Sequence, residues 1–149
     1  MVQRCLPEGA AEVLAVYGTQ YPAATLVCDL FQHCEQNPEL DEVVALLREV
    51  DATLDLCPIS NLKLQVVQSM EGHPIRRFFD QGIRCTLSTD DTFSFGNRLT
   101  DEYEALAEHL AFTPAELAQL AKNGFDVADL DDDERKDAHA AVDQFLVDG

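Results

Sequence analysis

The sequence predicts an α/β fold with parallel strands, and three features of its central part indicate this. Residues 53–57 and 83–87 are short apolar segments typical of buried strands. Residues 73–81, which lie between them, favour a helix that has a proline near its start and stops before Gly82. A strand, a crossover helix and a second strand form the unit from which parallel sheets are built.

Three further elements are predicted before this unit. Residues 7–17 favour a helix that begins at a proline and ends at a glycine. Residues 24–31 are predicted to form a short buried strand, although a helix also fits this apolar run. The next helix has Asn37 as its cap and a proline in its first turn. Its apolar stripe consists of Leu40, Val43, Val44 and Leu47.

After the first central strand, an irregular loop is expected through Gly72. The chain then closes with three helices, at about 101–111, 114–123 and 132–146. Thr100 is the expected cap of the first helix, and Thr113 with Glu116 forms a capping box at the second. Acidic residues begin the third helix, where the helix dipole favours them.

The composition restricts the function classes. The 149 residues carry 28 acidic and 10 basic side chains, a net charge of −18, which argues against nucleic acid as a partner. No apolar run is long enough for a membrane span, and the N-terminus lacks the apolar region of a signal peptide. The five cysteines contain no Cys-x-x-Cys, so reduced thiols and a cytoplasmic location are expected. A solvating acidic surface explains the charge most simply, and high internal salt would favour it.

The most informative polar residues follow the two central strands. The second strand leads into Asp90 and Asp91, and ligand sites in parallel α/β folds form at the carboxyl ends of strands. Adjacent side chains in an extended segment point in different directions, so one carboxylate could face a metal and the other a different ligand. Ser60 and Asn61 follow the first strand and could orient that site through hydrogen bonds. Solvated turns are the alternative interpretation of both segments.

Four motifs in this order resemble the adenosine/adenine deaminase family. They are Cys-Pro-Ile-Ser-Asn-Leu-Lys-Leu at 57–64, His-Pro-Ile at 73–75, Leu-Ser-Thr-Asp-Asp at 87–91 and Leu-Thr-Asp-Glu-Tyr at 99–103. The resemblance covers about residues 38–147. It implies a zinc-dependent (β/α)8 barrel, a TIM barrel, that removes the exocyclic amine of an aminopurine by hydrolysis. Residues 52–57 then match the seventh strand of the barrel and residues 83–88 the eighth.

The resemblance also implies roles for single residues. Asp90 matches the zinc-ligand aspartate, and Asp91 matches the aspartate that hydrogen-bonds a purine ring nitrogen. Thr92 stands where proline is common in the family. His33 is a candidate for the sixth-strand catalytic histidine that assists the attacking hydroxide, but both flanking glycines are missing. The alternative is that His33 is an ordinary surface or core histidine.

The other zinc ligands and the catalytic glutamate of the family come from His-x-His and His-x-x-Glu motifs, and neither occurs in this sequence. A complete barrel needs about 250 residues, so two or three parallel strands with terminal helices indicate a C-terminal fragment. We therefore expect residues 36–149 to be the C-terminal part of a deaminase-type barrel, after a poorly matching segment at 1–35. Activity would require the missing strands, and exposed strand edges would favour self-association. The alternative is an inactive remnant, or an interaction module that pairs with a separate N-terminal half.

Overall fold

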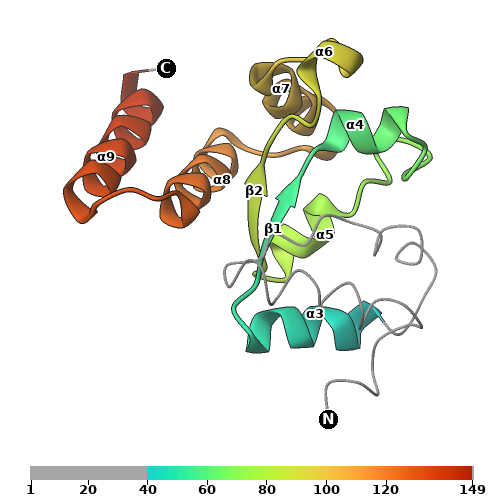
Figure 1. Ribbon diagram of the computed structural model, residues 1–149, viewed down its shortest axis with the longest axis horizontal. Coiled ribbons are helices and arrows are strands. Elements are labelled where there is room, and N and C mark those ends of the chain that lie inside the picture. Colours follow the sequence, from blue (N-terminus) through green and yellow to red (C-terminus); the bar gives the residue numbers. More distant parts are fainter. Residues whose placement is uncertain (1–39, 149) are drawn as a thin grey trace.

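The computed structural model describes residues 40–148, so the expectations for residues 7–17, residues 24–31, His33 and the Asn37 cap lie outside its described part. A two-stranded parallel sheet lies at the centre, with helices around it and extending to one side (Figure 1). In chain order the elements are α3 (Leu40–Glu49), β1 (Thr53–Leu56), α4 (Pro58–Lys63), α5 (Ile75–Asp80), β2 (Arg84–Leu87), α6 (Thr92–Phe95), α7 (Leu99–Leu110), α8 (Pro114–Val127) and α9 (Asp132–Asp148).

The predicted strand–helix–strand unit is confirmed. The two strands pair in parallel, with Leu54 opposite Cys85 and Leu56 opposite Leu87, and α5 lies between them in the chain. Gly82 ends the turn after α5 with a φ of +78°, a left-handed conformation that glycine adopts without steric cost. Both strands therefore deliver their carboxyl ends to the same edge of the sheet.

The two strands alternate between an apolar and a polar side. Leu54, Leu56, Cys85 and Leu87 belong to the hydrophobic core, because every second side chain of a strand shares a face. Asp55 and Thr86 lie opposite each other on the polar side, where the Thr86 hydroxyl donates a hydrogen bond of 2.8 Å to Asp55 Oδ1. This cross-strand bond favours the observed register of the strands.

Helices α5, α7 and α8 supply the apolar residues that cover the sheet. The core side chains that are almost inaccessible to solvent include Leu54, Leu56, Ile75, Leu106 and Leu120. Burial of one such side chain contributes about 1.5–3 kcal/mol. Helix α8 is also tied to β2, since the Asn123 side-chain amide donates a 2.8 Å bond to the Cys85 carbonyl.

The expected loop through Gly72 is wrong at its start, because residues 58–63 form helix α4. Pro58 occupies the first turn, where the missing N–H costs nothing. The expected end of α8 at Asn123 is also wrong: the helix continues through Gly124 to Val127. Tertiary contact at Asn123 outweighs the weak helix-breaking tendency of one glycine.

Two smaller differences concern the segment before α7. Helix α7 begins at Leu99 and its N-cap is Arg98, so the expected Thr100 cap is wrong. The Asp101 carboxylate accepts a 2.7 Å bond from the Arg98 backbone N–H and satisfies this helix end. The short helix α6 was not predicted, since one turn gives no apolar periodicity.

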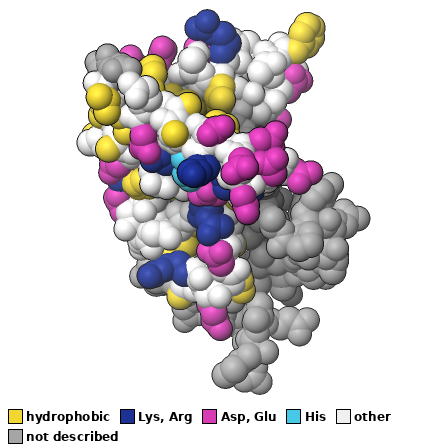
Figure 2. All heavy atoms as spheres, turned by 90° about the vertical axis from the view of Figure 1, so that its left-hand side faces the viewer, with side chains coloured by type: hydrophobic (Ala, Val, Ile, Leu, Met, Phe, Trp, Pro, Cys, Tyr) yellow, Lys and Arg dark blue, Asp and Glu magenta, His cyan; other side chains and the backbone are white. Residues whose placement is uncertain are grey.

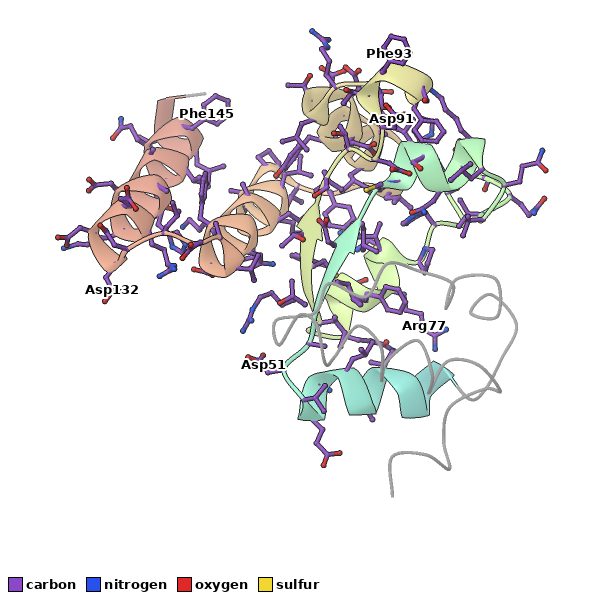
Figure 3. All side chains as sticks on the ribbon, in the orientation of Figure 1. Asp51, Arg77, Asp91, Phe93, Asp132 and Phe145 are labelled. Atoms are coloured by element: carbon purple, nitrogen blue, oxygen red, sulfur yellow. The ribbon has the colours of Figure 1, made fainter. Side chains whose placement is uncertain are left out.

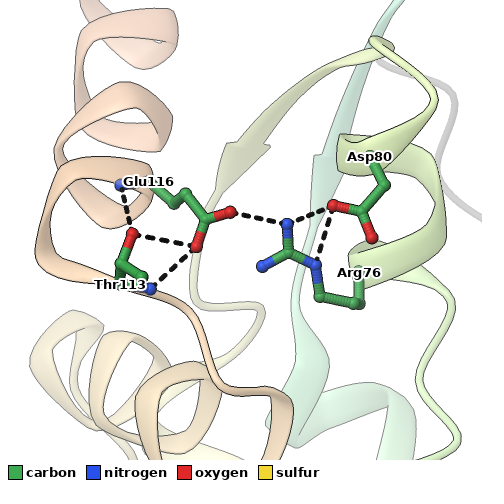
Figure 4. Close-up of polar contacts among 4 residues, drawn as sticks. All are labelled: Arg76, Asp80, Thr113 and Glu116. Atoms are coloured by element: carbon green, nitrogen blue, oxygen red, sulfur yellow. Dashed lines mark hydrogen bonds and ion pairs between the residues drawn. The ribbon is translucent and has the colours of Figure 1, made fainter.

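An arginine on α5 connects that helix to α8 (Figure 4). The Arg76 guanidinium forms an ion pair with Asp80 on its own helix and donates a 2.8 Å bond to Glu116. It also lies 4.1 Å above the centre of the Phe112 ring. Glu116 accepts hydrogen bonds from Thr113, so the predicted capping box is present and joins the same network.

Acidic side chains are widespread on the face shown in Figure 2. Helix α9, farthest from the sheet in Figure 1, begins with Asp132, Asp133 and Glu134, as predicted. Among residues 40–148, no helix has the length and apolar character of a membrane span.

Candidate functional site

The candidate site lies at the carboxyl ends of the two strands, where α4 follows β1 and α6 follows β2 (Figure 1). The backbone N–H of Ser88 donates a 2.9 Å bond to the Leu56 carbonyl and extends the pairing beyond β2. The Ser88 hydroxyl also donates a 2.6 Å bond to Asp55 Oδ1. These contacts fix the path of the chain just before Asp90.

Asp90 contacts one of the two polar residues that the sequence predicts to orient it. The Ser60 hydroxyl of α4 donates a 2.8 Å hydrogen bond to Asp90 Oδ2. Ser60 is 1% exposed, whereas the Asp90 residue is exposed. A buried hydroxyl therefore orients a carboxylate that still faces outward.

Asp91 points to a different partner. It is the N-cap of α6, and its Oδ1 accepts bonds from the backbone N–H groups of Phe93 (2.9 Å) and Ser94 (3.1 Å). The Ser94 hydroxyl donates to the other carboxylate oxygen. These hydrogen bonds, foremost those from Ser94, lower the pKa of Asp91 and keep the group ionised. In Figure 3, Asp91 and the exposed Phe93 lie at the α6 end of the molecule, far from Asp51.

Asn61 makes its contact with a histidine instead of with Asp90. Its Oδ1 lies 3.1 Å from Nε2 of His73, and His73 Nδ1 accepts a 3.2 Å bond from the Ile75 backbone N–H. Since Nδ1 accepts, Nε2 carries the proton and donates to Asn61. Burial lowers the pKa of His73 to about 4, so the ring is neutral near pH 7. Asn61 therefore connects α4 to the start of α5.

Glu102 is a buried residue of this region that the sequence reasoning did not single out. Its side chain is 0% exposed, and its two oxygens accept bonds from the Ile59 N–H (2.9 Å) and from Asn97 Nδ2 (2.7 Å). Burial raises the pKa of the Glu102 carboxyl. The only sequence signal was its place within the motif at 99–103, which carried the resemblance without an assigned role.

The described residues supply only part of the donor set that zinc requires. Structural and catalytic zinc sites use three or four His, Cys, Asp or Glu ligands. Residues 40–148 contain no group of three such side chains that could hold a metal ion. Asp90 fits as one oxygen donor, but the rest of a zinc site is not present in this part of the chain.

The family model for adenosine deaminase matches residues 24–145. An adenine deaminase from Sphingopyxis alaskensis is 35% identical over 120 residues, which are 80% of this chain and 35% of that protein. An adenosine deaminase from Plasmodium falciparum is 42% identical over 82 residues, or 55% of this chain and 22% of that protein. The chain thus spans about a third or less of the length of these curated relatives.

Solved structures agree with the sequence matches. The crystal structure of an adenine deaminase from Arthrobacter aurescens superposes with a TM-score of 0.68 at 28% identity, covering 70% of this chain and 32% of that one. An amidohydrolase from Burkholderia ambifaria with bound Zn gives a TM-score of 0.61 at 28% identity, covering 72% of this chain and 31% of that one.

These neighbours confirm the predicted fold class, a partial (β/α)8 barrel, of which residues 40–148 form two parallel strands and the terminal helices. The family model covers residues 24–145, which is most of the chain. The chain therefore belongs to the adenosine deaminase family.

Proposed function

We propose that this chain forms the C-terminal part of the active site of a hydrolytic purine deaminase. The observation that carries the proposal is the Ser60–Asp90 hydrogen bond of 2.8 Å at the carboxyl ends of two parallel strands. This edge of the sheet is where α/β barrels assemble their active sites. Relatives named adenine deaminase and adenosine deaminase support the reaction class.

In this proposal Asp90 is the metal ligand of the chain. One carboxylate oxygen accepts from Ser60, and Asp90 remains exposed. A bound zinc would lower the pKa of a water molecule to about 7 and so supply hydroxide at neutral pH. Ser60 holds the Asp90 carboxylate in one orientation, so that its oxygen is positioned to bind the metal.

Asp91 is the proposed substrate-recognition residue for the aminopurine. Its low pKa keeps it an acceptor, and an ionised carboxylate offers about four acceptor positions, more than the three bonds from α6 occupy. It could therefore accept from a protonated purine ring nitrogen while it caps α6. Asn61 supports the site through α4, and His33 is the proposed histidine beside the attacking hydroxide.

The alternative function is non-enzymatic: a remnant, or a module that pairs with a separate N-terminal half. Each strand of the sheet pairs with one other strand among residues 40–148, and an unpaired strand edge would support such pairing or self-association. Under this alternative, Asp90 and Asp91 would only fix the turns that lead into α6.

A chimera tests the two functions. The corresponding C-terminal third of the Sphingopyxis alaskensis adenine deaminase is replaced by residues 38–147 of this chain. We expect the chimera to retain zinc and to release ammonia from adenine or adenosine, whereas the 149-residue chain alone should do neither. A folded chimera without zinc and without activity would contradict the enzymatic proposal and favour the alternative.

A further inference from the structure

We propose that Glu102 is a positioning residue for Asp90 and acts through the first turn of α4. This inference deepens the proposed function and rests on it, because the orientation of Asp90 matters for catalysis only if Asp90 binds the metal. The Glu102 side chain is completely buried and belongs to α7, 43 residues from Ile59 in the chain. Its link to the site is therefore tertiary.

Two successive residues of α4 carry the connection. The Ile59 backbone N–H donates to Glu102 Oε2 at 2.9 Å, and the hydroxyl of the next residue, Ser60, donates to Asp90 Oδ2 at 2.8 Å. A displacement of this turn by even half an ångström would stretch both bonds beyond their usual range. The position of Glu102 therefore sets the position of the Ser60 hydroxyl.

The start of α4 needs this outside partner. Its N-cap, Cys57, makes no side-chain cap hydrogen bond, and Pro58 has no N–H to satisfy. The Ile59 N–H is thus the first donor of α4 that has no acceptor within the helix. The carboxylate of Glu102 on α7 accepts its hydrogen bond. A six-residue helix has little stability of its own, so tertiary contacts decide where it lies.

The far end of α4 is held by different residues. The Lys63 ammonium donates to the Phe95 carbonyl of α6, and Asn61 contacts His73 next to α5. These bonds can keep α4 folded when its first turn is released. Loss of Glu102 should therefore move Ser60 without unfolding the whole region.

The hydrogen bonds at Glu102 make a specific rescue possible. Asn97 Nδ2 donates to Glu102 Oε1 at 2.7 Å, while Asn97 Oδ1 is buried with no hydrogen-bond partner among the described residues. If Glu102 is replaced by Gln, rotation of the Asn97 amide would let its oxygen accept from the new Gln amide. The Gln oxygen would still accept from Ile59, so Gln restores the positioning, whereas Leu does not.

The test is NMR on the whole 149-residue chain without metal. The carboxyl ¹³C resonance of Asp90 reports its hydrogen bond, and Ser60→Ala gives the position of this resonance when the bond is absent. We expect Glu102→Leu to shift the resonance most of the way to the Ser60→Ala position and Glu102→Gln to keep it at the wild-type position. Glu104→Gln, on the same helix but exposed, is the matched control and should leave the resonance unshifted.

A folded Glu102→Leu variant with the wild-type Asp90 resonance would overturn the inference, as would a Glu102→Gln variant that behaves like Glu102→Leu. If Glu102→Leu does not fold, Glu102→Met removes the acceptor instead, since the flexible methionine side chain fills irregular gaps in a core. The same shift is then expected, and an unshifted resonance refutes the positioning role. Because the readout needs no metal, it is independent of whether the chimera binds zinc.

Discussion

Asp90 and Asp91 are adjacent in sequence but bind different elements. Asp90 accepts a hydrogen bond from Ser60 of α4, whereas Asp91 is the N-cap of α6. The two carboxylates therefore have different tasks before any ligand is considered. Their divergence follows from the extended backbone at Asp91, with a φ of −98° and a ψ of 99°.

We expect substitution by Asn to separate these tasks in the chimera. Asp90→Asn replaces an anionic donor by a neutral amide, so zinc content and activity should fall together. Asp91→Asn keeps a good N-cap and should keep zinc. It should lower kcat/KM about 10- to 150-fold, because a hydrogen bond to a charged group contributes about 1.5–3 kcal/mol. Zinc analysis and steady-state kinetics of both variants decide the outcome.

Asp91→Ala is the control for the cap, since it removes the capping oxygens and should cost about 1 kcal/mol of stability. Equal zinc retention in both Asn variants would exclude Asp90 as a ligand. Unchanged kinetics of Asp91→Asn would exclude Asp91 from substrate recognition.

Buried His73 predicts an acid-dependent loss of stability. Its pKa is about 4 in the folded chain, against 6.5 for a histidine in water, so the unfolded chain takes up the proton first as the pH falls. The free energy of unfolding should therefore be unaffected by His73 above pH 6.5 and decrease, by up to about 3 kcal/mol, between pH 6.5 and 4.

Urea unfolding of the wild type and of His73→Gln at several pH values measures this effect. The Gln amide can accept from a backbone N–H and does not titrate. The wild type should lose more stability than the variant between pH 6.5 and 4. Parallel pH profiles of the two proteins would refute the prediction.

Arg76 should stabilise the contact between α5 and α8. Arg76→Met keeps the apolar stem but loses two ion pairs and the contact with the Phe112 ring. The ring contact alone is worth about 0.5–1 kcal/mol, so we expect Tm to fall by at least about 2 °C. Lys136→Met removes one exposed positive charge on α9 and is the matched control. An equal change of Tm in both variants would show that net charge alone is responsible.

Salt should stabilise the chain because of its net charge of −18. The Debye length falls from about 30 Å at 0.01 M to about 3 Å at 1 M, which weakens the repulsion among exposed carboxylates. We expect Tm and helicity to increase over this range. The double variant Glu104→Gln/Glu108→Gln removes two exposed charges and should show a smaller salt response. A salt-independent Tm would contradict the role of repulsion.

The central unit was predictable because local signals and tertiary packing agree there. Both strands are short apolar runs, and proline and glycine mark the helix between them. Helix α4 was missed because Pro, Ser and Asn favour turns equally well, and its Ile59 N–H bonds a carboxylate 43 residues away. No local pattern contains that contact.

The candidate site was predictable only in part for the same reason. The place of Asp90 at the end of a strand follows from the sequence, and the position of Ser60 after the first strand predicts that it orients Asp90. In the structure Ser60 hydrogen-bonds Asp90, whereas Asn61 hydrogen-bonds His73 instead of Asp90. Glu102 could not be assigned, since a glutamate on a helix is normally exposed.

Of the two cysteines that the structure describes, buried Cys85 can report how often the sheet opens, whereas Cys57 is only half-buried. Burial raises the pKa of both Cys57 and Cys85 to about 12, and Cys85 is 0% exposed. A thiol that is neither ionised nor accessible does not react with an alkylating reagent until its strand leaves the core. The alkylation rate of Cys85, followed by mass spectrometry, would therefore measure how often β2 opens locally and exposes this thiol.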